Sequence, residues 1–487
     1  MLGEQIRSFF QSLTGNQKVI ELAVQLQQQL EKGHTAMAYN EWIEDELISN
    51  DGSYGYIVQH DGLAAFRRFF NQEKAIAADF KNSQSIEINS KELTQAKEYV
   101  CKMLNLSTID NHDKQWQASL EFLQHSRYIL SGGPGTGKTS TVIRMLLMYI
   151  YLNPKANIAL AAPTGKAANH MMQSMNNLLP KDLQQTAQTL HRLLGFNHQK
   201  NTVKYNQNNP LPYDLIIIDE ASMLDVTIAY RIIQALKPNA QLLLVGDKNQ
   251  LPSVEAGNVF ANLCKMVQSN YKELTENFRF SHDSIISKLC QSVINQDLKR
   301  FNKHCPSNNP QSTPDKFTAL QHWYKKVGKE PSVILSPTKF GNNSVTELNE
   351  LAIQILYNNN KLNDGMPIMV SKNDYTLNVF NGDIGSLQFN QQKWFANFTI
   401  EGVEKSINLE AINRWQVAHA ITIHKSQGSE YDHVLIVLPD DLELEILTSS
   451  LLYTAISRAK KSITIWSSQR IFAKTLLTTE NRMTFLN

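Results

Sequence analysis

Several common sequence features are missing from this chain. No apolar run approaches the roughly 18 residues of a membrane-spanning helix, so we expect no membrane association. The first residues contain no apolar signal-peptide core, which predicts a cytoplasmic protein. Only four cysteines occur in 487 residues, none of them in a C-x-x-C pair, and no histidine cluster accompanies them. We therefore expect neither a disulfide framework nor a zinc site, and we interpret the cysteines as buried free thiols in a reducing compartment.

An excess of charge is also missing. The chain has 47 Lys and Arg residues against 45 Asp and Glu residues, which is a formal net charge of +2. Because this charge produces no strong field around the whole molecule, any binding of nucleic acid must come from a local groove. The apolar fraction of 42% and the charged fraction of 19% are typical of a soluble globular protein, and the length predicts three or four domains.

A glycine-rich segment stands between a short apolar run and a helical pattern. Residues 131–140 read S-G-G-P-G-T-G-K-T-S and match G-x-x-x-x-G-K-[ST], with the apolar run at 128–130 and the helical pattern over 141–148. Strand, glycine-rich loop and helix in this order favour a phosphate-binding loop over an ordinary glycine-rich turn. The residues that we predict to bind ATP in this loop are Gly132, Gly133, Pro134, Gly135, Thr136, Gly137, Lys138, Thr139 and Ser140.

A second apolar run, at 215–218, ends in two carboxylates, Asp219 and Glu220. Such a strand end is where a phosphate-loop enzyme holds Mg²⁺, although an ordinary acidic turn has the same appearance when it stands alone. We predict that Lys138 reaches the β- and γ-phosphates, and that Thr139 and Asp219 hold Mg²⁺. Glu220 is predicted to orient or deprotonate the attacking water.

Two glutamines are candidates for sensing the nucleotide. Gln250 follows an apolar strand pattern that ends near residue 246, and it is predicted to report the γ-phosphate to the DNA-binding side. Gln117 stands in K-Q-W-Q before the phosphate loop, where its amide could read an adenine edge. A solvated helix residue is the alternative for Gln117.

Two arginines complete the predicted catalytic set. Arg279 lies in E-N-F-R-F, and Arg458 lies in Y-T-A-I-S-R. An arginine supplied from a second domain stabilises charge on the transferring phosphoryl group, and it makes domain closure depend on the nucleotide. Taken singly, each arginine is more often part of a surface ion pair, but their place in a series of motifs favours the catalytic hypothesis.

Three further segments, at 162–168, 189–194 and 419–430, combine hydroxyls, backbone amides and single basic side chains. Groups of this kind hold nucleic-acid phosphates without reading bases. The candidates for DNA binding are Pro163, Thr164, Lys166, His191, Thr422 and His424. A structural histidine is the alternative for His191 and His424, and Lys425 and Gln427 are candidates for facing the nucleotide instead.

The order of elements predicts an α/β fold. Buried strands at 158–162, 215–218 and 242–245 alternate with helices, which is typical of a parallel sheet with crossover helices. A second such region begins at residue 333. Short strands with glycine turns predict a small β-barrel inserted into it. The predicted domains are a mainly helical N-terminal domain (1–110), a first αβ domain (111–300), a second αβ domain (301–364 and 416–487) and the barrel (365–415).

Three segments leave alternatives open. Residues 63–70, L-A-A-F-R-R-F-F, are either an amphipathic core element or a docking surface for another protein or for DNA. Residues 196–212 form either a short projecting hairpin or a loop. Residues 301–330, rich in Pro, Asn and Ser, are a linker or an irregular insertion.

In order along the chain, these segments resemble the motif series of superfamily 1 helicases, and within it they are most similar to the RecD family, the alpha subunit of exodeoxyribonuclease V. The resemblance covers roughly 115–487 well, and the N-terminal part only weakly. The segments that carry it are 132–140, 161–168, 189–195, 218–225, 245–257, 277–280, 373–385, 422–430 and 453–460.

The resemblance implies two RecA-like P-loop motor domains, with an SH3-like barrel in the second. It implies ATP-driven 5′→3′ movement on single-stranded DNA at duplex ends, in double-strand break repair and homologous recombination. It also implies RecB- and RecC-like partner subunits, with the N-terminal domain docked on the RecC-like chain and the nuclease on the RecB-like chain. Two alternatives are a stand-alone RecD-like 5′→3′ helicase and a nucleotide-dependent scaffold subunit.

Overall fold

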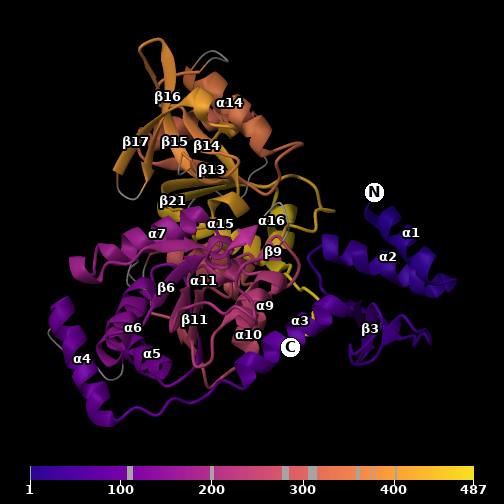
Figure 1. Cartoon of the computed structure of the whole chain (residues 1–487). Coiled ribbons are helices and arrows are strands. Elements are labelled where there is room, and N and C mark those ends of the chain that lie inside the picture. Colours follow the sequence, from indigo (N-terminus) through magenta and orange to yellow (C-terminus); the bar gives the residue numbers. More distant parts are fainter. Residues whose placement is uncertain are drawn as a thin grey trace.

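The structure is a computed structural model (Figure 1). The residues that it describes are 2–106, 113–197, 202–276, 284–304, 315–357, 362–374, 376–377, 379–400 and 403–486. Two parallel sheets form separate halves of the molecule, and the N-terminal part stands beside them as a third body. Among the helices of the described part, none is long and apolar enough to cross a membrane.

The first half contains a six-stranded sheet of order β12-β5-β11-β10-β6-β7, in which all neighbours are parallel. Its strands are β5 (Arg127–Gly132), β6 (Ile158–Ala162), β7 (Ala187–Thr189), β10 (Leu215–Ile218), β11 (Gln241–Gly246) and β12 (Tyr271–Leu274). The three strands predicted in this region are confirmed. Their continuous apolar runs arise because helices cover both faces of the sheet.

Alternate side chains of each strand pack on opposite faces of this sheet. In β10, Ile216 and Ile218 pack into one core, and Leu215 and Ile217 pack into the other. The first core holds α3 (Arg67–Lys81), α9 (Val226–Ala235) and α10 (Val259–Met266); the second holds α4 (Ser90–Leu104), α5 (Lys114–Leu123), α6 (Lys138–Leu152) and α7 (Gly165–Asn176).

The second half contains a four-stranded parallel sheet of order β19-β13-β20-β21. Its strands are β13 (Ser332–Ser336), β19 (Ala420–Thr422), β20 (Tyr431–Val437) and β21 (Ala459–Trp466). Its helices are α11 (Ile285–Ile294), α12 (Leu298–His304), α13 (Lys316–Val327), α14 (Val345–Tyr357), α15 (Ser449–Ile456) and α16 (Gln469–Leu477). By packing, α11 and α12 go with this second sheet, although the predicted boundary at residue 300 assigns most of them to the first domain.

The prediction of a linker or irregular insertion over 301–330 is wrong for its described second part. Residues 316–327 form the helix α13, capped by Asp315, whose carboxylate accepts from the Phe317 and Thr318 N–H groups. Leu320, Trp323 and Val327 bury one face of this helix against the second sheet. This apolar spacing is helical, and the prolines that precede it in the sequence obscured it.

An antiparallel five-stranded sheet of order β17-β16-β15-β14-β18 extends from the second half. Its strands are β14 (Pro367–Val370), β15 (Ile384–Asn390), β16 (Lys393–Ile400), β17 (Val403–Asn408) and β18 (Trp415–Val417). The short strands predicted between residues 365 and 415 are confirmed. Whether this sheet is an SH3-like barrel stays a prediction.

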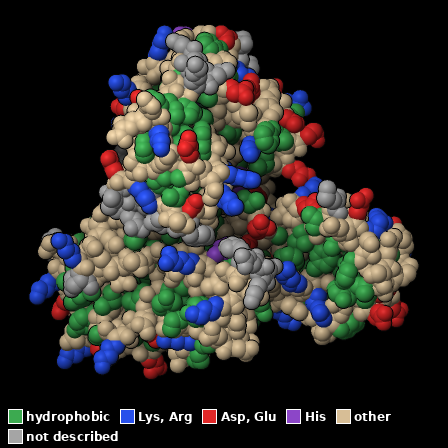
Figure 2. All heavy atoms as spheres, turned by 45° about the horizontal axis from the view of Figure 1, so that its top comes forward, with side chains coloured by type: hydrophobic (Ala, Val, Ile, Leu, Met, Phe, Trp, Pro, Cys, Tyr) green, Lys and Arg blue, Asp and Glu red, His purple; other side chains and the backbone are tan. Residues whose placement is uncertain are grey.

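The N-terminal part is helical, as expected, but it also contains a sheet that the sequence did not reveal. Its helices are α1 (Leu2–Leu13), α2 (Gln17–Glu31), α3 and α4, and its sheet has the order β1-β4-β3-β2. The strands are β1 (Met37–Ala38), β2 (Ile48–Ser49), β3 (Ile57–His60) and β4 (Leu63–Phe66). Figure 2 shows this body on the right, with hydrophobic side chains exposed on the face in view.

Two of the segments left open in sequence now have a structure. Residues 63–70 form β4 and the first turn of α3, in which Phe70 is buried and Arg68 is exposed. After the short helix α8 (Leu190–Leu193), β8 (Phe196–Asn197) and β9 (Thr202–Val203) pair antiparallel, so the described part of 196–212 includes a short hairpin. Its tip lies outside the described residues.

Candidate nucleotide-binding site

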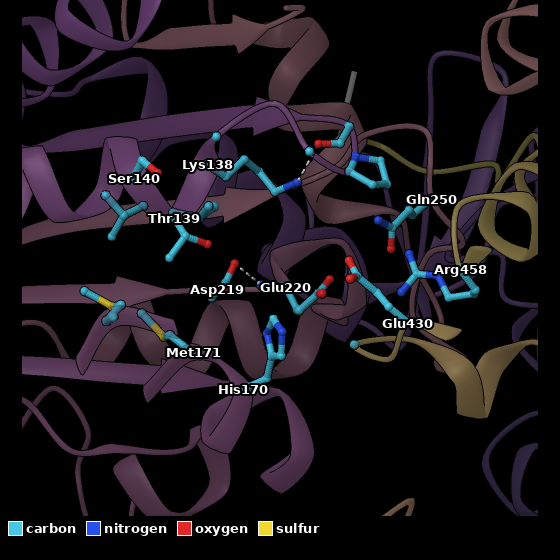
Figure 3. Close-up of a pocket in the computed structure, with 18 residues that line it drawn as sticks. Lys138, Thr139, Ser140, His170, Met171, Asp219, Glu220, Gln250, Glu430 and Arg458 are labelled. Atoms are coloured by element: carbon cyan, nitrogen blue, oxygen red, sulfur yellow. Dashed lines mark hydrogen bonds between the residues drawn. The ribbon is translucent and has the colours of Figure 1, made fainter. Parts of the chain in front are cut away.

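A pocket of about 350 Å³ lies between the two halves (Figure 3). The phosphate loop and the start of α6 line one side of it, and the end of β10 lies beneath. Gly428, Glu430 and Arg458 of the second half close the other side. Parallel strands end at a common edge, and this is why residues far apart in the sequence meet here.

The phosphate loop has the backbone of a phosphate cradle. Gly135 and Gly137 have φ angles of 76° and 81°, in the left-handed region that favours glycine. Helix α6 begins at Lys138, and Gly137 caps it without a side-chain hydrogen bond, which suits its first N–H groups for an anion. Lys138 Nζ donates to Gly132 O at 2.6 Å and to Gly133 O at 3.1 Å.

The two carboxylates after β10 are buried at the bottom of the pocket. The Glu220 N–H donates to Asp219 Oδ1 at 2.8 Å, and Glu220 has a left-handed backbone, with φ 51°. This conformation is strained for a non-glycine residue, and such strain is common at functional sites. Burial raises the pKa of both carboxyl groups, and the charge of Asp219 raises that of Glu220 further. The nearby Lys138 opposes both shifts.

Gln250, Glu430 and Arg458 lie side by side at one end of the pocket (Figure 3). Arg458 is only 4% exposed, and its Nη2 donates to Ser457 Oγ at 3.0 Å. Gln250 Nε2 donates to Asp247 Oδ2 at 3.3 Å. Gln250 Oε1 is buried and accepts no hydrogen bond from the residues that the structure describes. An arginine and an amide from opposite halves therefore face the same space as Lys138.

Among the described residues, hydrogen bonds join the two halves beside this pocket. Tyr453 Oη donates to Asp247 Oδ2 at 2.8 Å, and the Leu251 N–H donates to Thr454 Oγ1 at 2.9 Å. Gln427 Nε2 donates to Leu251 O at 3.1 Å. Gln427 therefore contacts the loop after Gln250. A change in the nucleotide pocket can reach the second half through these bonds.

His170 lines the pocket and was not singled out in the sequence. It lies on α7, where Figure 3 shows its ring below Glu220. The positions 166 and 170 are four apart on one helix, so they share a face. That spacing gave no signal for the pocket, because Lys166 itself contacts the insertion.

The predicted DNA-binding residues are not among those that line the nucleotide pocket. Pro163, Thr164 and Lys166 surround the start of α7, where Thr164 Oγ1 accepts from the Ala167 N–H at 3.2 Å. Lys166 Nζ donates to Gly382 O, in the insertion, at 3.2 Å. Burial lowers the pKa of Lys166 to about 8.

The remaining three predicted DNA-binding residues have varied surroundings. Thr422 ends β19, and its Oγ1 accepts from the Lys425 N–H at 3.4 Å. Burial lowers the pKa of His424. His191 packs edge-on against Phe196 with ring centroids 5.3 Å apart, and it lines a second cavity of about 810 Å³ beside Arg68 and Arg231.

Other predicted site residues are not placed in the pocket. Gly132 and Thr136 belong to the phosphate loop but are not among the residues that line the pocket. Gln117 is half-buried on α5 and is not among the pocket-lining residues, whereas its buried neighbour Gln115 donates from Nε2 to Thr136 O at 3.3 Å. Arg279 lies outside the described residues. The roles of Gln117 and Arg279 stay predictions. No cluster of three or more metal-ligating His, Cys, Asp or Glu side chains occurs among the residues that the structure describes.

Comparisons with known proteins agree with this architecture. Residues 115–256 match a family model described as an AAA domain, and residues 417–465 match a UvrD-like helicase C-terminal domain. The RecBCD enzyme subunit RecD of Haemophilus influenzae is 30% identical over 450 residues, which cover 74% of this chain and 69% of that protein. The chain belongs to the RecD family.

Other relatives and structures extend the comparison. RecD of Mycobacterium tuberculosis is 30% identical over 407 residues, 73% of this chain and 69% of that one. The ATP-dependent RecD2 DNA helicase of Deinococcus radiodurans is 31% identical over 350 residues, 69% of this chain but 46% of that one. A crystal structure of Pif1 helicase from Bacteroides with ADP-AlF3 and ssDNA has a TM-score of 0.50 at 18% identity, covering 77% of this chain and 95% of that one. The RecD-family chain therefore has the α/β fold of RecA-type helicase motor domains.

Proposed function

We propose that this RecD-family chain is the ATP-dependent 5′→3′ DNA helicase subunit of a cytoplasmic RecBCD-type complex, acting in double-strand break repair and homologous recombination. The observation that carries the proposal is the pocket between the halves. Lys138, Asp219 and Glu220 reach it from the first sheet, and Arg458 reaches it from the second. A nucleotide held there contacts both halves, so its chemical state can set their separation.

The residues present fit ATP and Mg²⁺. The left-handed glycines and the open N-terminus of α6 suit the phosphates, and Lys138 would neutralise part of their charge. Thr139 and Asp219 would hold Mg²⁺, which usually takes few protein ligands and keeps several waters. When bound, ATP supplies the free energy that drives movement. Glu220 would accept a proton from water, and Arg458 would stabilise negative charge from the opposite side.

Movement on DNA would follow from closure of the two halves. Thr164 belongs to the first half and Thr422 to the second, so a single strand held by phosphate contacts at both would be gripped at two points. Alternate loosening of the two grips as the pocket opens and closes would move the chain along the strand. The 5′→3′ direction is proposed from the family.

The domain assignment is part of the same proposal. Two RecA-like motor domains would contain the two parallel sheets, and the antiparallel sheet over 367–417 would be the SH3-like insertion. The N-terminal body would dock on a RecC-like subunit, and a RecB-like subunit would supply the nuclease. A stand-alone helicase is the second candidate, favoured by the similarity to the RecD2 helicase. A scaffold without catalysis has no chemical need for this pocket.

The direct test is ATP hydrolysis by the purified full chain with and without single-stranded DNA. Lys138→Gln is the informative variant, and Lys155→Gln, at an exposed position outside the pocket, is the matched control. We expect DNA to stimulate hydrolysis in the wild type and the control, and hydrolysis to be lost in Lys138→Gln. Undiminished turnover in Lys138→Gln would overturn the proposal. The same assay with RecB- and RecC-like chains added separates a subunit from a stand-alone enzyme.

A further inference from the structure

The last residues of the chain leave α16 and cross to the other parts of the molecule. We call residues 478–486 the C-terminal strap. Met483 O accepts from the Thr35 and Ala36 N–H groups at 3.0 and 3.1 Å. Thr484 Oγ1 and the Phe485 N–H donate to the buried carboxylate of Glu73 at 2.6 and 2.8 Å. Leu486, the last described residue, is buried in a core of the first sheet. The strap therefore ties the second half to the N-terminal body and to the first half.

Arg482 lies in the middle of this strap, and several defined contacts hold its side chain. Its Nη1 donates to Glu255 O and to Gly257 O, both at 2.9 Å, and its Nε donates to Glu480 Oε1 at 3.0 Å. The side chain is 10% exposed. A Cβ atom at Gly33 would lie 2.8 Å from Arg482 Cζ, so the guanidinium packs directly against that glycine.

The carbonyls that Arg482 binds belong to the loop that begins in the nucleotide pocket. Gln250 lines the pocket at the start of the loop. The Leu251 N–H and C=O are bonded to Thr454 and Gln427 of the second half. At the far end, the Gly257 N–H donates to Gly33 O at 2.9 Å, and α10 follows. Side chains of the second half thus hold this loop of the first half at both ends.

From this arrangement we infer that Arg482 is a positioning residue for the loop 250–257, through which the state of the nucleotide pocket is coupled to DNA. The inference rests on the proposed function. If the halves move as the pocket opens, the loop follows them at its near end through Leu251 and at its far end through Arg482. Without Arg482 the far end loses its attachment to the second half, while the pocket residues keep their own contacts. Hydrolysis then continues without DNA but responds poorly to DNA.

The test compares Arg482→Ala and Arg482→Lys in the full chain, with ATP hydrolysis measured across a range of oligothymidylate concentrations. Lys32→Ala is the matched control, because the Lys32–Glu445 ion pair at 2.7 Å joins the N-terminal body to the second half and does not involve the loop. We expect Arg482→Ala to keep basal kcat and the KM for ATP within about twofold, while maximal DNA stimulation falls at least about fivefold. Lysine, which can still donate to a carbonyl, is expected to restore part of the stimulation.

Three results would overturn the inference: wild-type stimulation in Arg482→Ala, an equal loss of basal and stimulated rates in that variant, or the same loss of stimulation in Lys32→Ala. The last two would mean that the contact only stabilises the fold. A wild-type chain that shows no DNA stimulation, either alone or with RecB- and RecC-like chains added, would overturn the proposed function, and this inference with it. The experiment therefore distinguishes failure of this inference from failure of the proposed function.

Discussion

Tyr453 Oη donates a 2.8 Å hydrogen bond to Asp247 Oδ2, and this bond joins α15 of the second half to the end of β11 in the first. Both groups are buried, and burial raises the pKa of the Asp247 carboxyl. A Cβ atom at Gly133 would lie 3.0 Å from the same Tyr453 oxygen, so the tyrosine also touches the phosphate loop. The side chain of Tyr453 therefore contacts the phosphate loop and also joins the two halves.

Tyr453→Phe removes this hydrogen bond and leaves the buried Asp247 carboxylate with one donor fewer. We expect the free energy of unfolding to fall by about 1–3 kcal/mol, the usual contribution of a buried hydrogen bond to a charged group. ATP turnover should fall as well, because the halves are held together less firmly. Urea unfolding and steady-state hydrolysis measure the two effects. Tyr151→Phe, at an exposed position on α6, is the control that should change neither.

Glu220→Gln is expected to leave ATP binding intact and to lower kcat by about 100-fold or more, the usual loss when a general base is removed. The amide keeps the shape of the side chain but cannot accept the proton of the attacking water. Equilibrium binding of a fluorescent ATP analogue and steady-state hydrolysis separate the two quantities. Glu443→Gln, at an exposed position, is the matched control. Wild-type kcat in Glu220→Gln would remove Glu220 from the catalytic set.

Lys166 is expected to make the free energy of unfolding of this chain depend on pH. Burial lowers its pKa from the ordinary 10.5 to about 8; the Asp383 carboxylate opposes the shift and Arg458 adds to it. Below pH 8 both folded and unfolded chains carry the proton, so the cost of the buried charge is fully present. Between about pH 8 and pH 10.5 the unfolded chain binds more protons, so the free energy of unfolding rises with pH.

Lys166→Met removes that cost and its pH dependence. We expect the variant to be more stable than wild type at pH 7 by about 1–3 kcal/mol, with the difference shrinking by pH 9.5. Urea unfolding at the two pH values measures it, and the exposed Lys155→Met is the control. A difference between variant and wild type that is the same at both pH values would contradict a buried, titrating lysine.

Gly165→Ala tests the contact between α7 and the insertion. A Cβ atom at Gly165 would lie 2.4 Å from Phe380 Cγ, so the loop that carries Phe380 must move. Overpacking of this kind costs about 1–3 kcal/mol, and we expect a loss of that size in urea unfolding. At Gly15 a Cβ atom meets nothing within 4 Å, so Gly15→Ala should leave stability nearly unchanged. Equal effects of the two substitutions would contradict the contact.

Strands with continuous apolar sequences could be predicted closely. The ranges predicted for β6 and β10 coincide with the observed strands, because each run is buried and ends at a turn residue. The N-terminal sheet could not be found in this way. Its strands β1 and β2 have two residues each, too few to show an alternating pattern, and only contacts with distant segments define them.

The residues of the pocket could be predicted only where they belong to a sequence motif. Lys138, Asp219, Gln250 and Arg458 belong to recognisable motifs, and they meet in one cavity. Their catalytic roles stay predictions until tested. The strap contacts of Arg482 left no sequence signal, because a side chain that donates to distant backbone carbonyls imposes no local pattern.

The most direct test of the account is strand separation on two matched substrates, one duplex with a 5′ single-stranded tail and one with a 3′ tail. We compare the full chain with its Lys138→Gln variant. Each is tested alone and together with RecB- and RecC-like subunits, in which the motor of the RecB-like subunit is inactivated. The account predicts ATP-dependent unwinding of the 5′-tailed duplex that disappears in Lys138→Gln. Unwinding of only the 3′-tailed duplex, or equal unwinding by Lys138→Gln, would contradict it.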